Sequence, residues 1–263
     1  MYDLPENYDI NKYDRPSVAV DIVVFTARKS PCESYRHLSK PMLSVLMTVR
    51  TEPPFKGMLS LPGGFTVRTE TIEQTAQRKL LEKTGVSGLP LSLLCNSSAL
   101  GRDPRGWIIS CGYSTLVEFS KVKISEETAG WYDISLDYCE TGKLTLTSDS
   151  GAVHTMMFRQ TGEKNEIIDN GGIAFDHAQI IIKGVAALQN SLKDPDSVFR
   201  LLPTEFTLSD LQMTYEAILG RQLLTPNFRR KIAPYVEETG RSETGAGHRP
   251  SKLYRAKKRD ENF

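Results

Sequence analysis

The chain has 263 residues, of which 39% are hydrophobic and 25% are charged. This ordinary globular mixture excludes a mostly disordered chain, a fibrous repeat and a disulfide-stapled mini-protein, and no apolar run reaches the roughly 18–20 residues of a membrane span. The net charge of +1 is unevenly distributed, because residues 220–263 hold eleven Lys/Arg against five Asp/Glu. A basic end on an acidic body indicates that this end meets a polyanion.

The first residues and the cysteines favour a cytoplasmic location. The chain begins without a basic start or an apolar core, so we expect no secretory signal and no membrane partner. The four cysteines, Cys32, Cys95, Cys111 and Cys139, form no C-x-x-C pair. We interpret them as reduced thiols rather than as metal ligands or disulfides.

The pattern along the chain predicts a polar arm over residues 1–16 and an α/β domain over residues 17–192. β-branched residues over 17–28 and alternation over 42–50 indicate two strands. Apolar side chains at helical spacing over 69–83, followed by a glycine suited to a left-handed stop, predict a helix. Further strands are predicted over 58–61, 91–98, 107–119 and 143–159, and a helix over 176–191 with Asp176 as N-cap and Gln179 three residues on. Residues 120–144 have no assignable pattern.

A polar break over 191–197 separates a C-terminal region of different texture. Two short helices joined by a turn at Gly220 make a helix-turn-helix candidate, and a β-hairpin with a Gly-rich tip would form the wing. The predicted elements are a helix over 207–219 capped by Thr207, a helix over 225–233 with Thr225 as cap and Pro226 at the first helical position, and strands over 236–239 and 251–255. We therefore predict a winged helix-turn-helix over residues 197–263.

The second of these helices carries candidate DNA contacts. Phe228 and Ile232 lie four residues apart and would face the small core, which leaves the polar and basic side chains on other faces. Side chains near the start of such a helix read base edges, and cations meet phosphates or the minor groove. The alternative is a solvated basic tail without a ligand. The candidate DNA-binding residues are Thr225, Asn227, Arg229, Arg230, Lys231, His248, Arg249, Lys252, Tyr254 and Arg255.

A motif for diphosphate chemistry lies inside the α/β domain. The pattern Gly64-x5-Glu70-x7-Arg78-Lys79-Leu80-x-Glu82-Lys83-x-Gly85-Val86, preceded by Leu61-Pro62-Gly63, resembles the Nudix box. The resemblance implies an α/β/α sandwich in which three glutamates on one helix face hold hard cations against a pyrophosphate. Here lysines stand at two of these three positions, and a protonated lysine cannot ligate a hard cation. We predict no metal site, no catalytic residue and no hydrolysis.

The two lysines are open to two interpretations, a solvated surface or a pair of ammonium groups that hold a diphosphate without cutting it. The segment Arg102-Asp103-Pro104-Arg105 resembles one found in Nudix proteins that handle ADP-ribose. Its arginines can hold phosphate or ribose oxygens, although a β-turn with a structural Arg–Asp pair is the alternative. The candidate effector-binding residues are Arg50, Gly63, Gly64, Arg78, Lys79, Glu82, Lys83, Arg102, Asp103 and Arg105. We interpret His177 as structural.

Residues 17–257 as a whole resemble the Nudix-related transcription regulators of bacteria. The resemblance rests on the Nudix box followed by Ala174-Phe175-Asp176-His177-Ala178, then Leu202-Pro203-Thr204-Glu205-Phe206-Thr207-Leu208, then Phe228-Arg229-Arg230-Lys231. It implies a ligand-responsive DNA-binding repressor of NAD-metabolism or sugar-use genes that senses ADP-ribose or a related phosphorylated metabolite, with no further cofactor.

A double-stranded operator with two half-sites needs two recognition helices roughly 34–36 Å apart, so we expect a homodimer. One rival interpretation is a Nudix hydrolase of ADP-ribose or a similar nucleotide diphosphate. Another is an effector-binding protein that meets a protein partner instead of DNA.

Overall fold

The computed structural model describes residues 8–29, 41–124, 128–137, 141–161, 164–243 and 251–257. The segment over 30–40, between the first two predicted strands, and most of the Gly-rich hairpin tip lie outside these ranges, as do Cys32, Cys139, His248 and Arg249. Within them, Cys95 and Cys111 are free thiols. None of the helices in these ranges combines the length and the apolar character that crossing a bilayer requires.

A mixed sheet of ten described strands forms the centre of the molecule, in the order β10-β9-β8-β7-β2-β1-β6-β5, with β3 paired to β2 and β4 to β1. The central strand β1 runs antiparallel to β2 and parallel to β6. The strands are β1 (Ser17–Lys29), β2 (Pro41–Val49), β3 (Leu59–Ser60), β4 (Gly63–Phe65), β5 (Ser92–Ser97), β6 (Ile108–Leu116), β7 (Ala129–Asp137), β8 (Gly142–Ser148), β9 (Val153–Thr161) and β10 (Lys164–Asp169).

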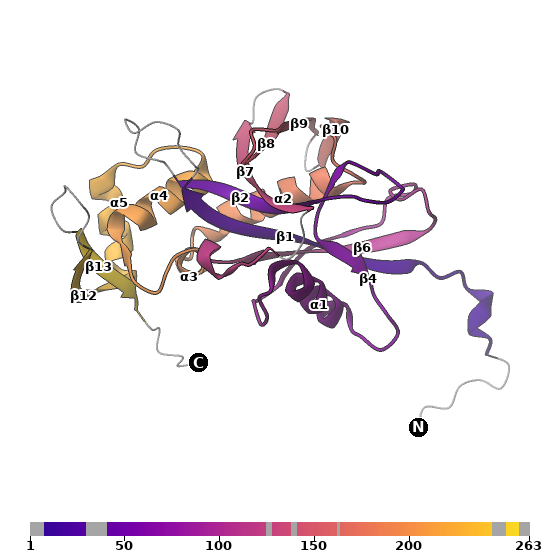
Figure 1. Ribbon diagram of the computed structural model, residues 1–263, viewed down its shortest axis with the longest axis horizontal. Coiled ribbons are helices and arrows are strands. Elements are labelled where there is room, and N and C mark those ends of the chain that lie inside the picture. Colours follow the sequence, from indigo (N-terminus) through magenta and orange to yellow (C-terminus); the bar gives the residue numbers. More distant parts are fainter. Residues whose placement is uncertain are drawn as a thin grey trace.

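One long helix covers each face of this sheet (Figure 1), α1 (Ile72–Thr84) on one side and α2 (His177–Ser191) on the other. The alternation of a strand explains why β1 reads as nearly continuous apolar sequence. Val20, Ile22 and Val24 join the core beneath α1, while Val23 and Phe25 join the core beneath α2. The predicted sandwich is confirmed.

The two helices begin differently. At the start of α1 the side chain of Thr71 accepts from the N–H of Gln74, whose own side chain accepts from the N–H of Thr71, and the helix ends at Gly85 with φ of 69°. Asp176 does stand at the N-cap of α2, but its side chain makes no capping hydrogen bond. The predicted N-cap position is confirmed, but the carboxylate does not cap the helix because it is held by Arg102 and Ser97.

The C-terminal region is a winged helix-turn-helix, as predicted. A three-stranded sheet in the order β11-β13-β12 packs beside the helices. The capping box of α4 joins Thr207 and Asp210, and Gly220 ends the helix with φ of 66°. The elements are α3 (Asp196–Phe199), β11 (Phe206–Thr207), α4 (Leu208–Leu219), α5 (Thr225–Ile232), β12 (Val236–Glu243) and β13 (Ser251–Ala256), with 3-10 turns η1 (Ile10–Lys12), η2 (Phe119–Lys121) and η3 (Ala233–Tyr235).

Helix α5 begins one residue earlier than predicted. Leu224 holds the N-cap position without a side-chain hydrogen bond, and Thr225 is already the first helical residue. Pro226 therefore lies one position further into the first turn, where its missing N–H still costs nothing. The polar face of the helix is unaffected by this shift of one residue in the cap.

Several strands have no clear signal in the sequence. β7 occupies the segment that had no assignable pattern, β10 lies beyond the strand predicted over 143–159, and β4 and β11 are too short to show a period. The predicted strand over 143–159 folds as the hairpin of β8 and β9. These segments form strands because they pair with strands far away in the sequence, such as β7 with β2, and a local pattern does not show such pairing.

The winged helix packs directly against the α/β part of the molecule. Their buried apolar side chains form one continuous cluster, and the side-chain amide of Gln189 on α2 donates to the carbonyl oxygen of Ile218 on α4 at 3.0 Å. The winged helix lies at one end of the sheet, and residues 8–16 leave from the opposite end (Figure 1).

Candidate ligand pocket and nucleic-acid interface

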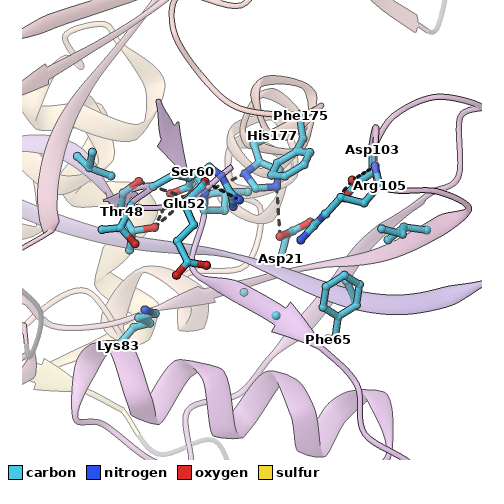
Figure 2. A pocket seen from close by; sticks show the side chains of 18 of the residues that line it. Asp21, Thr48, Glu52, Ser60, Phe65, Lys83, Asp103, Arg105, Phe175 and His177 are labelled. Carbon is cyan, nitrogen blue, oxygen red and sulfur yellow. Dashed lines mark hydrogen bonds and ion pairs between the residues drawn. The ribbon is translucent and has the colours of Figure 1, made fainter. Parts of the chain in front are cut away.

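A cavity of about 330 Å³ lies beside β1, where the loops after β2 and β5 meet the start of α2. Figure 2 shows the side chains that surround it. Seven of the predicted effector residues line it, Arg50, Gly63, Gly64, Lys83, Arg102, Asp103 and Arg105. Lining residues that the sequence did not single out for a ligand include Asp21, Thr48, Ser60, Phe65, Phe175 and His177.

A buried pair of acid and imidazole forms one wall. Nε2 of His177 lies 3.2 Å from a carboxylate oxygen of Asp21, and the N–H of Leu61 donates to Nδ1 of the same ring at 2.9 Å. Because Nδ1 accepts a hydrogen bond, the ring proton sits on Nε2 and points to Asp21. The imidazole thus joins α2 to β1 and to the segment after β3, which is a structural role.

Asp21 is 7% exposed and is the lone charge within residues 18–26 of β1. Burial opposes its ionisation, yet contacts with His177, Ser110 and Arg102 hold the pKa of its carboxyl below the usual value of 3.8. A buried carboxylate that stays ionised needs such partners. A single Asp within a strand that is buried on both faces was the signal that could have identified it.

Arg102 is committed to protein carboxylates. Its guanidinium donates to both oxygens of Asp176, at 2.9 and 2.5 Å, lies 3.6 Å from Asp21, and its side chain is 4% exposed. Burial opposes the charge of Asp176, but these hydrogen bonds lower the pKa of its carboxyl. Arg102 therefore ties the loop after β5 to the first turn of α2 at the floor of the cavity.

Arg50 and Arg105 are more accessible. Arg105 makes a two-point contact with the buried Asp103, at 2.9 and 2.7 Å, and its side chain is 41% exposed. Arg50 donates to the carbonyl oxygen of Pro54 at 2.7 Å. Partial burial and the neighbouring Arg105 lower the pKa of the Arg50 guanidinium, so these two cations form an electropositive rim.

The residues of the Nudix box divide into two groups. Three of them lie outside the lining of the cavity, Arg78, Lys79 and Glu82. Arg78 donates two hydrogen bonds to Glu70 and a third to Glu82. Lys79 donates to Glu82 at 2.7 Å. Lys83 does line it and rises toward it from α1 (Figure 2). Partial burial opposes the charge of Glu82, but Lys79 and Arg78 hold its pKa below the usual 4.5.

The exposed face of α5 carries the residues of this helix that are predicted to contact DNA. Phe228 and Ile232 are 4% and 1% exposed and anchor the helix in the core. The other side chains fall on the outer surface, and Lys231 also lies over the ring of Tyr215 at 5.7 Å. The exposed candidates are Thr225, Asn227, Arg229, Arg230 and Lys231.

The candidates on the wing have partners within the hairpin. Lys252 pairs with Glu238 at 3.0 Å, which raises the pKa of its ammonium group, and Arg255 pairs with Glu237 at 2.5 Å. Tyr254 is half-buried and packs against the core. Because such exposed pairs contribute little energy, a phosphate can displace either glutamate.

Comparisons with known proteins agree with this architecture. The NUDIX domain description matches residues 16–121, and the NrtR DNA-binding winged helix domain description matches residues 198–256. The ADPR responsive transcriptional repressor NtrR of Acinetobacter baylyi is 30% identical over 260 residues, which are 97% of this chain and 88% of the repressor. The ADP-ribose pyrophosphatase of Methanocaldococcus jannaschii is 32% identical over 132 residues, 48% of this chain and 69% of that enzyme.

Solved structures show the same arrangement of both parts. A MutT/nudix family protein from Enterococcus faecalis has a TM-score of 0.71 and 25% identity, with 97% of this chain and 90% of that chain covered. Shewanella oneidensis NrtR complexed with a 27mer DNA has a TM-score of 0.64 and 28% identity, with 91% and 93% covered. Because a 30% identical relative aligns across nearly the whole chain, the protein belongs to the NrtR family of transcriptional regulators, in which a Nudix domain precedes a DNA-binding winged helix.

Proposed function

We propose that this protein is a transcriptional repressor that binds ADP-ribose in its Nudix domain, does not hydrolyse it, and leaves its operator in response. The observation that carries the proposal is the full-length likeness to a repressor responsive to this ligand, which includes the ligand-binding and the DNA-binding parts together. The division into an arm (1–16), an effector domain (17–192) and a winged helix (197–263) is part of the proposal.

The cavity suits a nucleotide diphosphate. Arg50, Arg105 and Lys83 present cations around an opening lined by both polar and aromatic side chains, and guanidinium groups bind phosphate oxygens through paired hydrogen bonds. Arg102 shapes the floor, since its Nε and one of its terminal nitrogens donate to Asp176. Gly63 lets β4 pack closely on β1 beside the cavity, because a Cβ at this position would overlap the carbonyl oxygen of Val20.

The metal of Nudix hydrolases does not fit the residues present. Hard cations require oxygen ligands, and the helix face that would supply them carries Lys79, Glu82 and Lys83, with both oxygens of Glu82 already accepting hydrogen bonds from Arg78 and Lys79. Among the residues that the structure describes, no three His, Cys, Asp or Glu side chains gather in a way that could hold a metal ion.

The experiment is a fluorescence-anisotropy titration of a labelled DNA fragment from the upstream region of the gene, first with protein and then with ADP-ribose. We expect tight binding that weakens steeply as salt rises and is reversed by ADP-ribose, because a ligand shifts DNA affinity only through its different affinity for two states of the protein. Specific DNA binding that ADP-ribose does not change would contradict the proposed effector.

The hydrolase interpretation has one observation in its favour, the likeness of the Nudix part to an ADP-ribose pyrophosphatase. Incubation with ADP-ribose and Mg²⁺ followed by chromatography for AMP separates the two interpretations. We expect no turnover above the buffer control, and AMP formation that depends on Mg²⁺ would establish the enzyme instead. Light scattering during chromatography tests the expected homodimer.

A further inference from the structure

We propose that the junction between the α/β domain and the winged helix holds a second small-molecule site, which takes an amphipathic organic anion. The site is a cavity of about 430 Å³, here called the junction cavity. It is lined by the end of α2, the C-terminal half of α4, the turn after α4 and one side of α5. It shares no lining residue with the cavity beside β1, so the inference does not depend on the proposed function.

The walls of the junction cavity are mostly apolar. The rings of two aromatic residues and four leucines line it, Tyr215, Phe228, Leu192, Leu219, Leu223 and Leu224. Leu224 is 73% exposed and holds the N-cap position of α5, where polar side chains are strongly preferred. An apolar side chain in solvent at such a position gains free energy when an apolar ligand covers it.

The charged groups around the junction cavity are all cations. Lys193 follows α2, Arg221 lies in the turn after α4, and Lys231 belongs to α5. Among the residues that the structure describes, no Asp or Glu lines this cavity and none of these three cations is in an ion pair. An anion can therefore enter without displacing a protein carboxylate, whereas the cations of the wing hairpin already pair with glutamates.

Tyr215 adds a polar group that lacks a partner. The residue is 2% exposed, and its hydroxyl has no hydrogen-bond partner in the described part of the chain. Burial raises the pKa of this hydroxyl, so it keeps its proton and remains a donor. Because buried polar groups nearly always find a partner, we assign the missing acceptor to the acidic group of the bound anion.

The apolar walls favour a small amphipathic anion over the backbone of DNA, the other anion that a winged helix meets. Contacts to DNA phosphates come from cations and polar groups, and leucines add nothing to them. A ligand with an apolar body and one acidic group uses both the leucines and the cations. The volume of the cavity is within the range of small-molecule sites, roughly 300–1,000 Å³.

The test uses the full-length protein and two probes. Anilinonaphthalene sulfonate is an amphipathic anion that reports apolar binding surface by its fluorescence, and octanoate competes with it. The variants are L224Q, which removes one apolar wall, and K193Q/R221Q, which removes two cations. We expect each variant to weaken octanoate binding about 5- to 20-fold, through lost apolar burial in the first and lost charge-assisted contacts in the second. Octanol, which lacks the charge, should bind K193Q/R221Q and the wild type alike.

Matched controls lie outside the junction cavity. L100Q also replaces an exposed leucine, because Leu100 is 97% exposed, and K143Q/R159Q removes two exposed cations from β8 and β9. Both controls should bind octanoate as the wild type does. All the replaced side chains are exposed, so the variants should fold, and near-ultraviolet circular dichroism checks that they do.

Three outcomes would overturn the site. They are a wild type from which octanoate displaces no probe, an L224Q variant with wild-type affinity for octanoate, and a K193Q/R221Q variant with wild-type affinity. If that last variant also loses affinity for the operator, its cations contact the DNA backbone instead. None of these outcomes involves ADP-ribose, so the proposed function is decided separately by its own anisotropy titration.

Discussion

Arg102 illustrates at the scale of a single residue how a buried charge can organise the wall of a cavity. Its guanidinium is buried against Asp176 and Asp21, so that the loop after β5 and the first turn of α2 share one ion-pair network. Breaking such a network leaves an unpaired carboxylate in a poorly solvated place. The cost of that is larger than the worth of the pair itself.

We expect Arg102→Met to lower the free energy of unfolding by about 3–5 kcal/mol, as measured by urea denaturation at pH 7. The control is Arg241→Met, because Arg241 forms an exposed pair with Glu205 at 3.3 Å and should cost less than about 1 kcal/mol. Similar losses in both variants would show that burial of the Arg102 network contributes little.

The same network predicts a pH dependence. The pKa values of Asp21 and Asp176 in the folded protein lie below the usual 3.8, so their stabilisation is present above that pH and is lost as the pH falls through the folded values. In Arg102→Met these pKa values should rise, and the loss of stability should begin at a higher pH than in the wild type. Denaturation curves between pH 7 and 3 measure this, and parallel profiles would contradict it.

At the scale of elements, α1 keeps the geometry of a Nudix helix with a changed charge. Positions 79, 82 and 83 still share one face, as the i, i+3 and i+4 relation requires. We expect K79E/K83E to acquire detectable Mg²⁺ binding by calorimetry, whereas the matched K79Q/K83Q, which removes the charges without adding carboxylates, should not. Undetectable binding in K79E/K83E would mean that the two lysines are not what prevents metal binding.

The exposed face of α5 is expected to supply phosphate contacts. Replacing Arg230 and Lys231 together with alanine should weaken operator binding at least 100-fold and reduce the slope of log affinity against log salt by up to about two. The control is K143A/R159A, which removes two exposed cations from β8 and β9. Unchanged anisotropy curves for R230A/K231A, with an intact circular dichroism spectrum, would refute the recognition-helix assignment.

At the scale of the molecule, α2 connects the two sites. Its first turn meets the cavity through His177, and near its other end Gln189 bonds to Ile218 of α4. Cavities of about 430 and 340 Å³ lie against this contact, and both include Gln189 and Leu219 in their linings. A contact flanked by unfilled space can rearrange more easily than a closely packed one.

We expect Gln189→Ala to reduce the coupling between ligand and DNA while each binds separately as in the wild type. Coupling is reciprocal, so ADP-ribose should weaken DNA binding by a smaller factor, and DNA should weaken ADP-ribose binding by the same smaller factor. Anisotropy with and without ADP-ribose, and calorimetry with and without DNA, measure both factors. Wild-type coupling in the variant would show that the Gln189 contact does not transmit the signal.

Local chemistry determined much of the fold in advance. Several features act within a few residues, so the helix ends and faces that they set do not depend on the rest of the chain. They are the capping boxes at Thr71 and Thr207, the left-handed glycines at 85 and 220, and the apolar pair Phe228 and Ile232. The spacing of the Nudix box likewise placed Gly64 at the cavity and Lys79, Glu82 and Lys83 on one helix face. The Nudix box and the helix-turn-helix pattern, in that order along the chain, predicted the order of the two domains and carried the family resemblance.

Tertiary contacts decided the rest, because they join residues far apart in the sequence. Asp176 had the sequence of an N-cap, but a buried arginine 74 positions earlier bonds its carboxylate. Arg102 and Arg105 look equivalent in the motif, and both line the cavity, yet the side chain of Arg102 is buried whereas that of Arg105 is exposed. Phe65 and Phe175 likewise line one cavity because β4 packs against β1 and the backbone before α2 is left-handed, and neither feature leaves a periodic signal in the sequence.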